Sequence, residues 1–299
     1  MNRSKLIGAT ALASVMAAGA AQAEMSISGL FAGTLSDSDG GGLASSFSTN
    51  SIYVSYSDSM DNGMGVGVSM SVTSASITTD VNIDTGMGTI GLGTGQDSAV
   101  DGFDGSPACY SLNACGSALS GKTGGAGVYN DGDTVSGNSI AYSNSMGGVS
   151  FKVTRGMENT DATTGNSAVM SYAASTSLMG ATVKAGVSSI DYKGATADID
   201  PSFVTVGYSL AGLSLGYAMY DGDNGGEETQ MGVGTSMMGM SVGVTFAEAD
   251  LATDVDYTRI SASKGMGAAS FGVDYTETDT AGGTTGDSDT WQFTYVVGF

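Results

Sequence analysis

Apolar and polar side chains alternate along most of the chain after residue 23. The stretches 66–73, 213–219, 231–237 and 242–246 place Val, Leu, Met, Tyr or Phe at nearly every second position, with Gly, Ser, Thr or Ala between them. A period of two is the repeat of a β-strand whose two faces meet different environments. The pattern therefore predicts an all-β fold in which one face of each strand is apolar and the other carries small, mostly polar residues.

Two kinds of connection separate the strands. Short links containing glycine recur at 146–148, 178–180, 210–212, 238–239 and 264–265, whereas longer segments rich in Asp, Gly and Thr occupy 156–165, 191–200, 221–228 and 276–289. Strands are expected to be centred near residues 30, 53, 69, 80, 91, 141, 151, 171, 185, 206, 216, 233, 244, 258, 272 and 294, which makes about sixteen. Near 258, Tyr257, Arg259 and Ile260 interrupt the alternation and predict a β-bulge.

No segment after residue 23 approaches the roughly 18 consecutive apolar residues that a membrane-spanning helix needs. A transmembrane barrel strand needs only about 10 residues, of which every second one is apolar. Short turns at one end and longer polar loops at the other are typical of such barrels. The predicted fold is a transmembrane antiparallel β-barrel of about sixteen strands.

The first residues have the composition of a secretory signal peptide. Arg3 and Lys5 precede the apolar stretch 6–18, and Ala21-Gln22-Ala23 is a small-residue cleavage site. We therefore expect a signal peptide at 1–23 and one barrel domain at 24–299. Removing the two basic residues leaves 7 Lys and Arg against 30 Asp and Glu, so the net charge is 7 − 30 = −23. Such an acidic chain is not expected to bind nucleic acid.

The last strand carries a nearly continuous aromatic face. Trp291, Phe293, Tyr295 and Phe299, together with Val297, alternate with Gln, Thr, Val and Gly. This segment resembles the final strand of the porins of Gram-negative outer membranes. In that family the terminal Phe and its alternate aromatics are read by the barrel-insertion machinery. The resemblance implies the same assembly signal, partner and membrane here.

Two further segments resemble strands of general diffusion porins. Residues 90–98 are similar to the strand that leads into the third loop, and residues 138–143 are similar to the strand that follows it. The resemblance implies that residues 95–137 form a long loop folded into the lumen, and that the protein is a homotrimer. One feature departs from the family, whose constriction carries arginines on early strands. Here no Lys or Arg occurs between Glu24 and Gly121.

Charged residues of the loop and of the inward-facing strand positions are the candidate pore-lining groups. The loop contributes acids, and alternation points five further charges into the lumen, because a charge on the lipid face costs about 2–4 kcal/mol at mid-bilayer. The expected constriction residues are Asp97, Asp101, Asp104, Lys152, Lys184, Asp80, Asp84 and Asp274. The alternative is that some of them lie at the rim and that 95–137 is an ordinary outer loop.

Cys109 and Cys115 are the only cysteines. A secreted protein meets an oxidising compartment, so a disulfide between them is expected. Two thiols alone are too few ligands for a metal site. The acidic loop 221–227 lacks the spacing of an EF-hand, so it is interpreted as solvated, with weak Ca²⁺ or Mg²⁺ binding to acidic loops as the alternative. No cofactor is expected.

The chain contains no histidine, which excludes Ser-His-Asp and Cys-His catalysis. An enzyme is therefore not expected, although carboxylate pairs occur by chance in so acidic a chain. Three functions remain. The first is a water-filled, cation-preferring channel for passive diffusion of small hydrophilic solutes and ions. The second is a substrate-specific outer-membrane channel. The third is a secreted acidic β-rich adhesin, against which the repeat of paired turn types argues.

Overall fold

The computed structural model describes residues 24–39, 41–73, 76–94, 96–105, 109–110, 112, 138–156, 165–193, 198–223, 226–250, 254–281 and 287–299. The predicted signal peptide lies outside these residues. Within them, no helix is long and apolar enough to cross a membrane. The regular structure consists of antiparallel strands.

Sixteen strands form a closed barrel in which each strand pairs with its neighbours in the chain, and β1 pairs with β16. The strands are β1 (Glu24–Ser38), β2 (Gly42–Ser59), β3 (Gly65–Val72), β4 (Ile77–Asp84), β5 (Thr89–Gly93), β6 (Ser139–Met146), β7 (Val149–Gly156), β8 (Gly165–Leu178), β9 (Ala181–Lys193), β10 (Ser202–Leu210), β11 (Leu213–Asp221), β12 (Glu227–Met237), β13 (Met240–Asp250), β14 (Val255–Met266), β15 (Ala269–Thr280) and β16 (Ser288–Gly298). The predicted fold class and strand number are confirmed.

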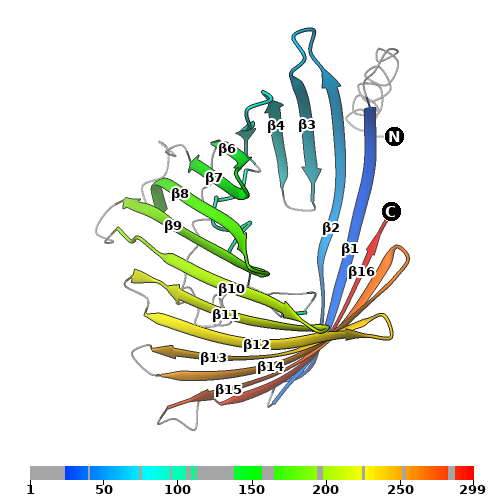
Figure 1. Ribbon diagram of the computed structural model, residues 1–299. Helices are drawn as coiled ribbons and strands as arrows, with labels where there is room; N and C mark the ends of the chain where they lie inside the picture. Colours follow the sequence, from blue (N-terminus) through cyan, green and yellow to red (C-terminus); the bar gives the residue numbers. More distant parts are fainter. Residues whose placement is uncertain are drawn as a thin grey trace.

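The barrel closes between the two ends of the chain. β1 and β16 pair from Leu30 opposite Gly298 to Ser38 opposite Thr290, and Figure 1 shows the two strands, blue and red, side by side. The backbones of Gly29 and Phe299 add two hydrogen bonds, from Gly29 N to Phe299 O at 2.9 Å and from Phe299 N to Gly29 O at 3.1 Å. The C-terminal residue therefore belongs to the seam of the barrel.

The β-bulge predicted near residue 258 is wrong. β14 pairs with both neighbours without a shift in register. Tyr257 and Arg259 face one side and Ile260 faces the other, so the period of two continues, and only the size of the side chains departs from the usual pattern. The irregularities lie elsewhere, between Ala32 and Thr34 in β1 and between Asn166 and Ala168 in β8.

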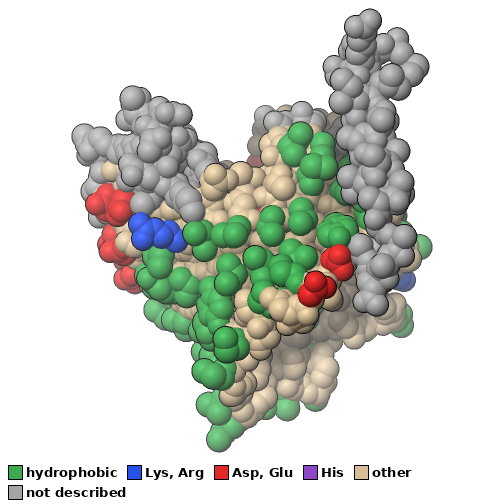
Figure 2. Space-filling view, turned by 90° about the horizontal axis from the view of Figure 1, so that it is seen from above, with side chains coloured by type: hydrophobic (Ala, Val, Ile, Leu, Met, Phe, Trp, Pro, Cys, Tyr) green, Lys and Arg blue, Asp and Glu red, His purple; other side chains and the backbone are tan. Residues whose placement is uncertain are grey.

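The outer face of the barrel is apolar. Large side chains that alternate along the strands are strongly exposed, among them Phe246, Met231 and Trp291. In the space-filling view, hydrophobic side chains form a broad patch that contains few charged groups (Figure 2). Exposure of so much apolar surface is incompatible with water and indicates a lipid environment. The other face of each strand is therefore the inner wall.

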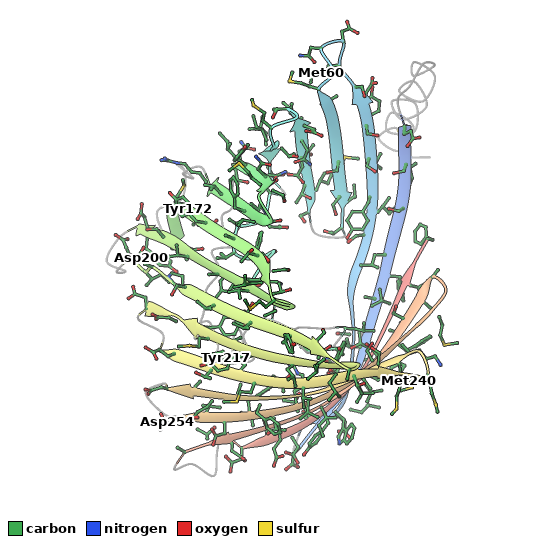
Figure 3. The ribbon with its side chains drawn as sticks, in the orientation of Figure 1. Met60, Tyr172, Asp200, Tyr217, Met240 and Asp254 are labelled. Atoms are coloured by element: carbon green, nitrogen blue, oxygen red, sulfur yellow. The ribbon has the colours of Figure 1, made fainter. Side chains whose placement is uncertain are left out.

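The five two-residue turns lie at one end of the barrel, and the longest loops lie at the other. The turns between β6 and β7, β8 and β9, β10 and β11, β12 and β13, and β14 and β15 have two residues each. In Figure 3, Met240 lies beside a two-residue turn at the right, whereas Asp200 and Asp254 lie at the left, at the long-loop end. Short turns are periplasmic and long loops extracellular in outer-membrane barrels, which orients the chain in its membrane.

Candidate functional site

Strand register decides which charged side chains share the inner face. Asp80 lies opposite Ser69, Asp84 opposite Gly65, and Lys152 opposite Ser143. Lys184 lies opposite Ser175 and Thr205, and Asp274 lies opposite Ser261. All five charges therefore lie on the face of the small polar residues, as the alternation predicts. Their role at a constriction stays a prediction.

The segment that follows β5 turns inward and runs along this inner face. The Lys152 ammonium donates to the backbone carbonyl oxygens of Asp97 at 3.0 Å and of Ser98 at 3.3 Å. Thr154 Oγ1 donates to the same carbonyl of Asp97 at 3.2 Å, and the Ala99 N–H donates to Ser171 Oγ at 2.7 Å. Inward-facing side chains of β7 and β8 thus hold the start of the loop against the wall.

A small hydrophobic cluster holds the next part of the loop. Ala99 and Val100 are fully buried, and Figure 1 shows the strands of this wall, β8 to β11, side by side. Their partners are the inward-facing side chains Ala173, Phe203, Ala218 and Tyr220, with Phe103 packed against the cluster. The Tyr220 hydroxyl also donates to the Asp104 carbonyl oxygen at 2.7 Å. Buried apolar contacts inside an otherwise polar lumen fix the loop in one place.

Further along, the loop also contacts β14. The Tyr110 N–H donates to Ser261 Oγ of β14 at 3.3 Å, and the Tyr110 hydroxyl hydrogen-bonds Ser214 Oγ of β11 at 3.0 Å. Glycines make room for these side chains. A Cβ on Gly234 would overlap the Tyr110 ring, and one on Gly272 would lie 3.0 Å from Leu112 Cγ. The described part of residues 95–137 therefore follows the inner face of the wall from β7 to β15.

The loop acids differ in their surroundings. Asp97 and Asp101 are exposed, whereas Asp104 is only 9% exposed. The remaining loop, including Cys115, lies outside the described residues, so the constriction loop as a whole stays a prediction. Cys109 is disulfide-bonded, and its pairing with Cys115 likewise stays a prediction.

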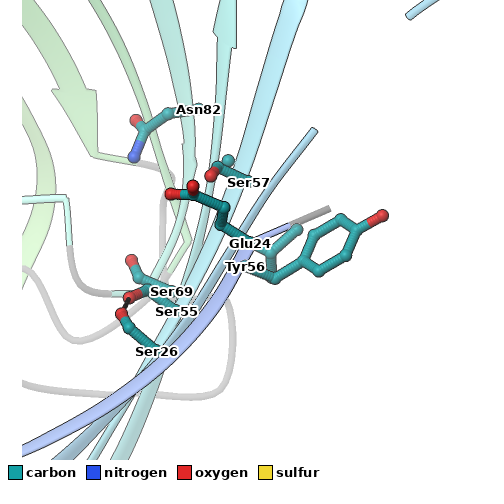
Figure 4. A pocket seen from close by; sticks show the side chains of 9 residues that line it. Glu24, Ser26, Ser55, Tyr56, Ser57, Ser69 and Asn82 are labelled. Carbon is teal, nitrogen blue, oxygen red and sulfur yellow. Dashed lines mark hydrogen bonds between the residues drawn. The ribbon is translucent and has the colours of Figure 1, made fainter. Parts of the chain in front are cut away.

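The wall of β1 to β5 carries a groove of small polar groups. A cavity of about 300 Å³ lies against Glu24, Ser26, Ser55, Ser57, Gly67, Ser69 and Asn82, with Tyr56 and Val68 also at its edge. Figure 4 shows the hydroxyl, amide and carboxylate groups gathered on one side and Tyr56 pointing away. Ser26 and Ser55 hydrogen-bond each other at 2.7 Å. No Lys or Arg lies on these five strands, so this wall is neutral or acidic throughout.

A model of the Gram-negative porin family matches residues 8–297. The chain belongs to this family. No curated protein matches the sequence. An anion-selective porin from Comamonas acidovorans is 12% identical, covers 93% of this chain and 100% of its own, and superimposes with a TM-score of 0.73. The in-vitro folded trimer form of OmpT, an outer membrane protein of Vibrio cholerae, is 12% identical with a TM-score of 0.70 and covers 93% and 100% of the two chains. A mutant of the porin from Rh. blastica is 15% identical, with a TM-score of 0.63 and coverages of 92% and 100%.

These similarities extend over the whole barrel and show that the chain has the porin fold. Family and fold place this porin in the Gram-negative outer membrane, where it forms a channel for diffusion. The predicted family, fold and location are confirmed.

Sequence reasoning missed a second group of charges in this porin. Glu228 and Gln230 of β12 are each 1% exposed, and Gln230 Nε2 donates to Glu228 Oε1 at 2.6 Å. Arg259 lies on the same face of β14, its guanidinium carbon 5.2 Å from the centre of the Tyr257 ring. The signal was present, because Met231 and Val233 on the outer face imply that Glu228 and Gln230 face inward.

The predicted weak metal binding concerns acidic loops that the structure describes only in part. Among those residues, no group of three or more His, Cys, Asp or Glu side chains could hold a metal ion. Loop 221–227 lies partly outside the described residues, at Asn224 and Gly225. Weak Ca²⁺ or Mg²⁺ binding there stays a prediction.

Proposed function

We propose that this porin is a passive, cation-preferring channel for small hydrophilic solutes and ions. It acts as a homotrimer and performs no covalent chemistry. The proposal rests on one observation, which is the unequal distribution of charge around the inner face. The wall of β1 to β5 contributes Glu24, Asp80 and Asp84 and no base, and the described loop contributes the exposed Asp97 and Asp101.

The bases of the inner face are fewer, and the loop occupies one of them. Lys152, Lys184 and Arg259 are the inward-facing bases among the described strands. The Lys152 ammonium is held by two loop carbonyl oxygens, so it lies beside the exposed Asp97. The partial negative charge of these carbonyl oxygens weakens the positive field that Lys152 presents to the lumen. A permeating ion therefore meets net negative charge, which concentrates cations and repels anions.

Two further points support a non-enzymatic trimeric channel. Without histidine, this chain lacks the base that most hydrolytic sites use. The OmpT structure with a similar fold is described as a trimer form, which favours the same assembly here. Proteins with this fold differ in selectivity, since the Comamonas acidovorans porin is anion-selective. Selectivity therefore has to be measured on this chain.

The test is the zero-current potential of the purified trimer in a planar bilayer with tenfold different KCl on the two sides. Cation preference makes the dilute side positive. The double change Asp97→Asn and Asp101→Asn should reduce this potential, most clearly at low salt, where the Debye length is about 30 Å at 0.01 M against about 3 Å at 1 M. The matched control changes two exposed acids of the outer face, Glu277→Gln and Asp279→Asn. It removes the same charge and should leave the potential unchanged.

A dilute side that becomes negative in the wild type would overturn the cation preference. A potential equally reduced by the lumen pair and by the outer pair would show that total charge, and not the loop, is its source. Gel filtration with light scattering tests the trimer independently.

A further inference from the structure

Five successive turns at the short-turn end contain no polar side chain. They connect β6 to β7, β8 to β9, β10 to β11, β12 to β13 and β14 to β15, and we call them the apolar rim. Their sequences are Met146-Gly147-Gly148-Val149, Leu178-Met179-Gly180-Ala181, Leu210-Ala211-Gly212-Leu213, Met237-Met238-Gly239-Met240 and Met266-Gly267-Ala268-Ala269. Tight turns in water are normally built from Asn, Asp, Ser and Gly, so the composition of this rim needs a cause.

Three residues of the apolar rim have backbone conformations that rarely suit their side chains. Met179, Ala211 and Met238 have φ angles of 51°, 50° and 54°, in the left-handed region where Asn or Gly is the usual choice. The side chains of Met179 and Met238 are 93% and 92% exposed, so packing within the chain does not explain them. Methionine is unfavourable at a positive φ, and these two side chains make few contacts within the protein. We therefore attribute their presence to contacts with something outside the chain.

The height of the outer apolar face indicates what those contacts are. At the long-loop end this face stops at a row of exposed, outward-facing acids, here called the acidic belt: Asp221, Glu227, Glu248, Asp250, Asp256, Glu277, Asp279 and Asp289. Eight residues separate Leu213 from Asp221, Met240 from Glu248 and Ala269 from Glu277.

At about 3.4 Å per residue and a strand tilt of roughly 40°, eight residues span about 20 Å across the membrane. The apolar band of such barrels is about 25 Å tall. The strands alone are therefore too short to fill the band. The height of the apolar outer face matches the thickness of the apolar band only when the turns themselves are included.

The remaining turns at this end supply an internal contrast. β1 continues for the five residues Glu24–Ser28 beyond its last contact with the C-terminus at Gly29, paired with β2 alone. The β2–β3 turn lies beyond that extension and contains Asp61 and Asn62. In Figure 3 its residue Met60 stands well apart from Met240. The projecting β2–β3 turn is polar, and the β4–β5 turn contains Thr85, whereas the five turns of the apolar rim contain no polar side chain.

One charged side chain locates the boundary. Among the described strands that meet at the apolar rim, Lys264 is the outward-facing charged residue within four residues of a turn. A long lysine side chain can lay its methylenes along apolar surface and carry the ammonium to the phosphates of the headgroups. Its place two residues before Met266 therefore sets the headgroup level close to the rim.

We propose that the apolar rim is embedded in the inner, phospholipid leaflet of the outer membrane. Its Met and Leu side chains contact acyl chains, while the polar turn between β2 and β3 projects into water. The two central residues of each turn keep backbone N–H and C=O groups that strand pairing does not use, and such groups are costly deep in hydrocarbon. The turns therefore lie at the boundary between headgroups and acyl chains, with their side chains directed inward.

The test uses the single tryptophan of the chain. Trp291→Phe removes the native emission, and Met237→Trp then places one fluorophore on the rim at a position without a positive φ. The porin is reconstituted into phosphatidylcholine vesicles whose acyl chains are brominated, and acrylamide is added on both sides as an aqueous quencher. Bromolipid should quench most of the emission, and acrylamide should have little effect. Leu213→Trp repeats the measurement on the neighbouring turn if the first variant folds poorly.

The matched control is Asp61→Trp in the same Trp291→Phe background, at the exposed tip of the polar turn. Its emission should respond to acrylamide and not to bromolipid. Equal responses of Trp at 237 and at 61 would overturn the proposal, and so would a rim fluorophore quenched only from water.

The thioethers of the rim methionines could also bind Cu(I). Quenching by added Cu(I) without any effect of bromolipid would assign the rim to a soft metal and reject the lipid contact.

Discussion

Val100 is the residue whose change tests most directly how the loop is held in the lumen. Its side chain is fully buried between the loop and the wall, among Ala173, Phe203 and Tyr220. A Cβ on Gly186 would lie 2.6 Å from Val100 Cγ1, so the missing side chain of Gly186 provides the space that Val100 fills. Val100→Ala removes two carbons from this contact and leaves every barrel strand intact.

The magnitude follows from the buried carbons. At about 0.8 kcal/mol for each buried CH₂, the loss is about 1.6 kcal/mol, and the cavity left behind adds to it. Because the barrel does not depend on Val100, the free energy that falls is that of loop docking. The equilibrium between docked and released loop should shift toward release by about 15-fold, since 1.4 kcal/mol corresponds to a factor of ten.

Hydrogen exchange of the purified protein in detergent, followed by mass spectrometry, measures this shift. Peptides covering residues 96–105 should exchange faster by about that factor, because the hydrogen bond from the Ala99 N–H to Ser171 opens with the loop. Peptides from β11 to β13 should keep their wild-type rates. Val233→Ala, on the outer face, is the control and should change neither region.

Equal exchange of the loop in Val100→Ala and wild type would refute the reasoning. It would mean that the hydrogen bonds between the loop and Lys152, Ser171 and Tyr220 hold the loop without help from the apolar contact. Faster exchange throughout the barrel would refute it differently, by showing that loop and barrel open as one unit.

Two further predictions concern assembly and the cysteines. Deleting Phe299 removes the two backbone hydrogen bonds to Gly29 and the terminal aromatic side chain, so the yield in the outer membrane should fall. Phe299→Leu keeps the hydrogen bonds and separates the two causes, and equal yields of wild type and deletion at low expression would contradict the role of this strand. Intact mass before and after reduction, followed by alkylation, should show one disulfide between Cys109 and Cys115. Two free thiols in freshly isolated protein would contradict the predicted disulfide between Cys109 and Cys115.

The barrel could be predicted because its environment imposes a repeat of two on every strand. All sixteen predicted centres fall inside observed strands, even for β5, which has five residues. Each strand between lipid and water must keep one apolar face. The repeat of two is therefore present even in strands that contain glycines or differ in length. The β-bulge predicted near residue 258 is wrong for a related reason. The large side chains of Tyr257 and Arg259 look like a break in the sequence pattern, although both continue the inner face, where Tyr257 is buried with Ala247 and Ala249.

The contacts of the loop could not be predicted. The bond from Lys152 to the Asp97 carbonyl joins residues 55 apart, and the bond from Tyr110 to Ser261 joins residues 151 apart. Every residue has a backbone carbonyl, so the sequence does not show which one accepts a hydrogen bond. Likewise, the sequence does not distinguish a serine that binds the loop from the other serines of the inner wall. The burial of Asp104, compared with the exposure of Asp97, likewise depends on which way the loop turns, and its charge alone does not reveal this.

The long reach of these loop contacts imposes an order of events on biogenesis. The loop leaves β5 early in the chain, but its partners Ser171, Tyr220 and Ser261 belong to β8, β11 and β14. The three positions face one another in a single wall only after β8 to β14 have paired, so the loop can make all three contacts only once this part of the barrel has formed. In a barrel intermediate in which β14 has not yet paired, Tyr110 lacks its hydrogen bond to Ser261. In such an intermediate the wall holds the described part of the loop at fewer points than in the finished barrel.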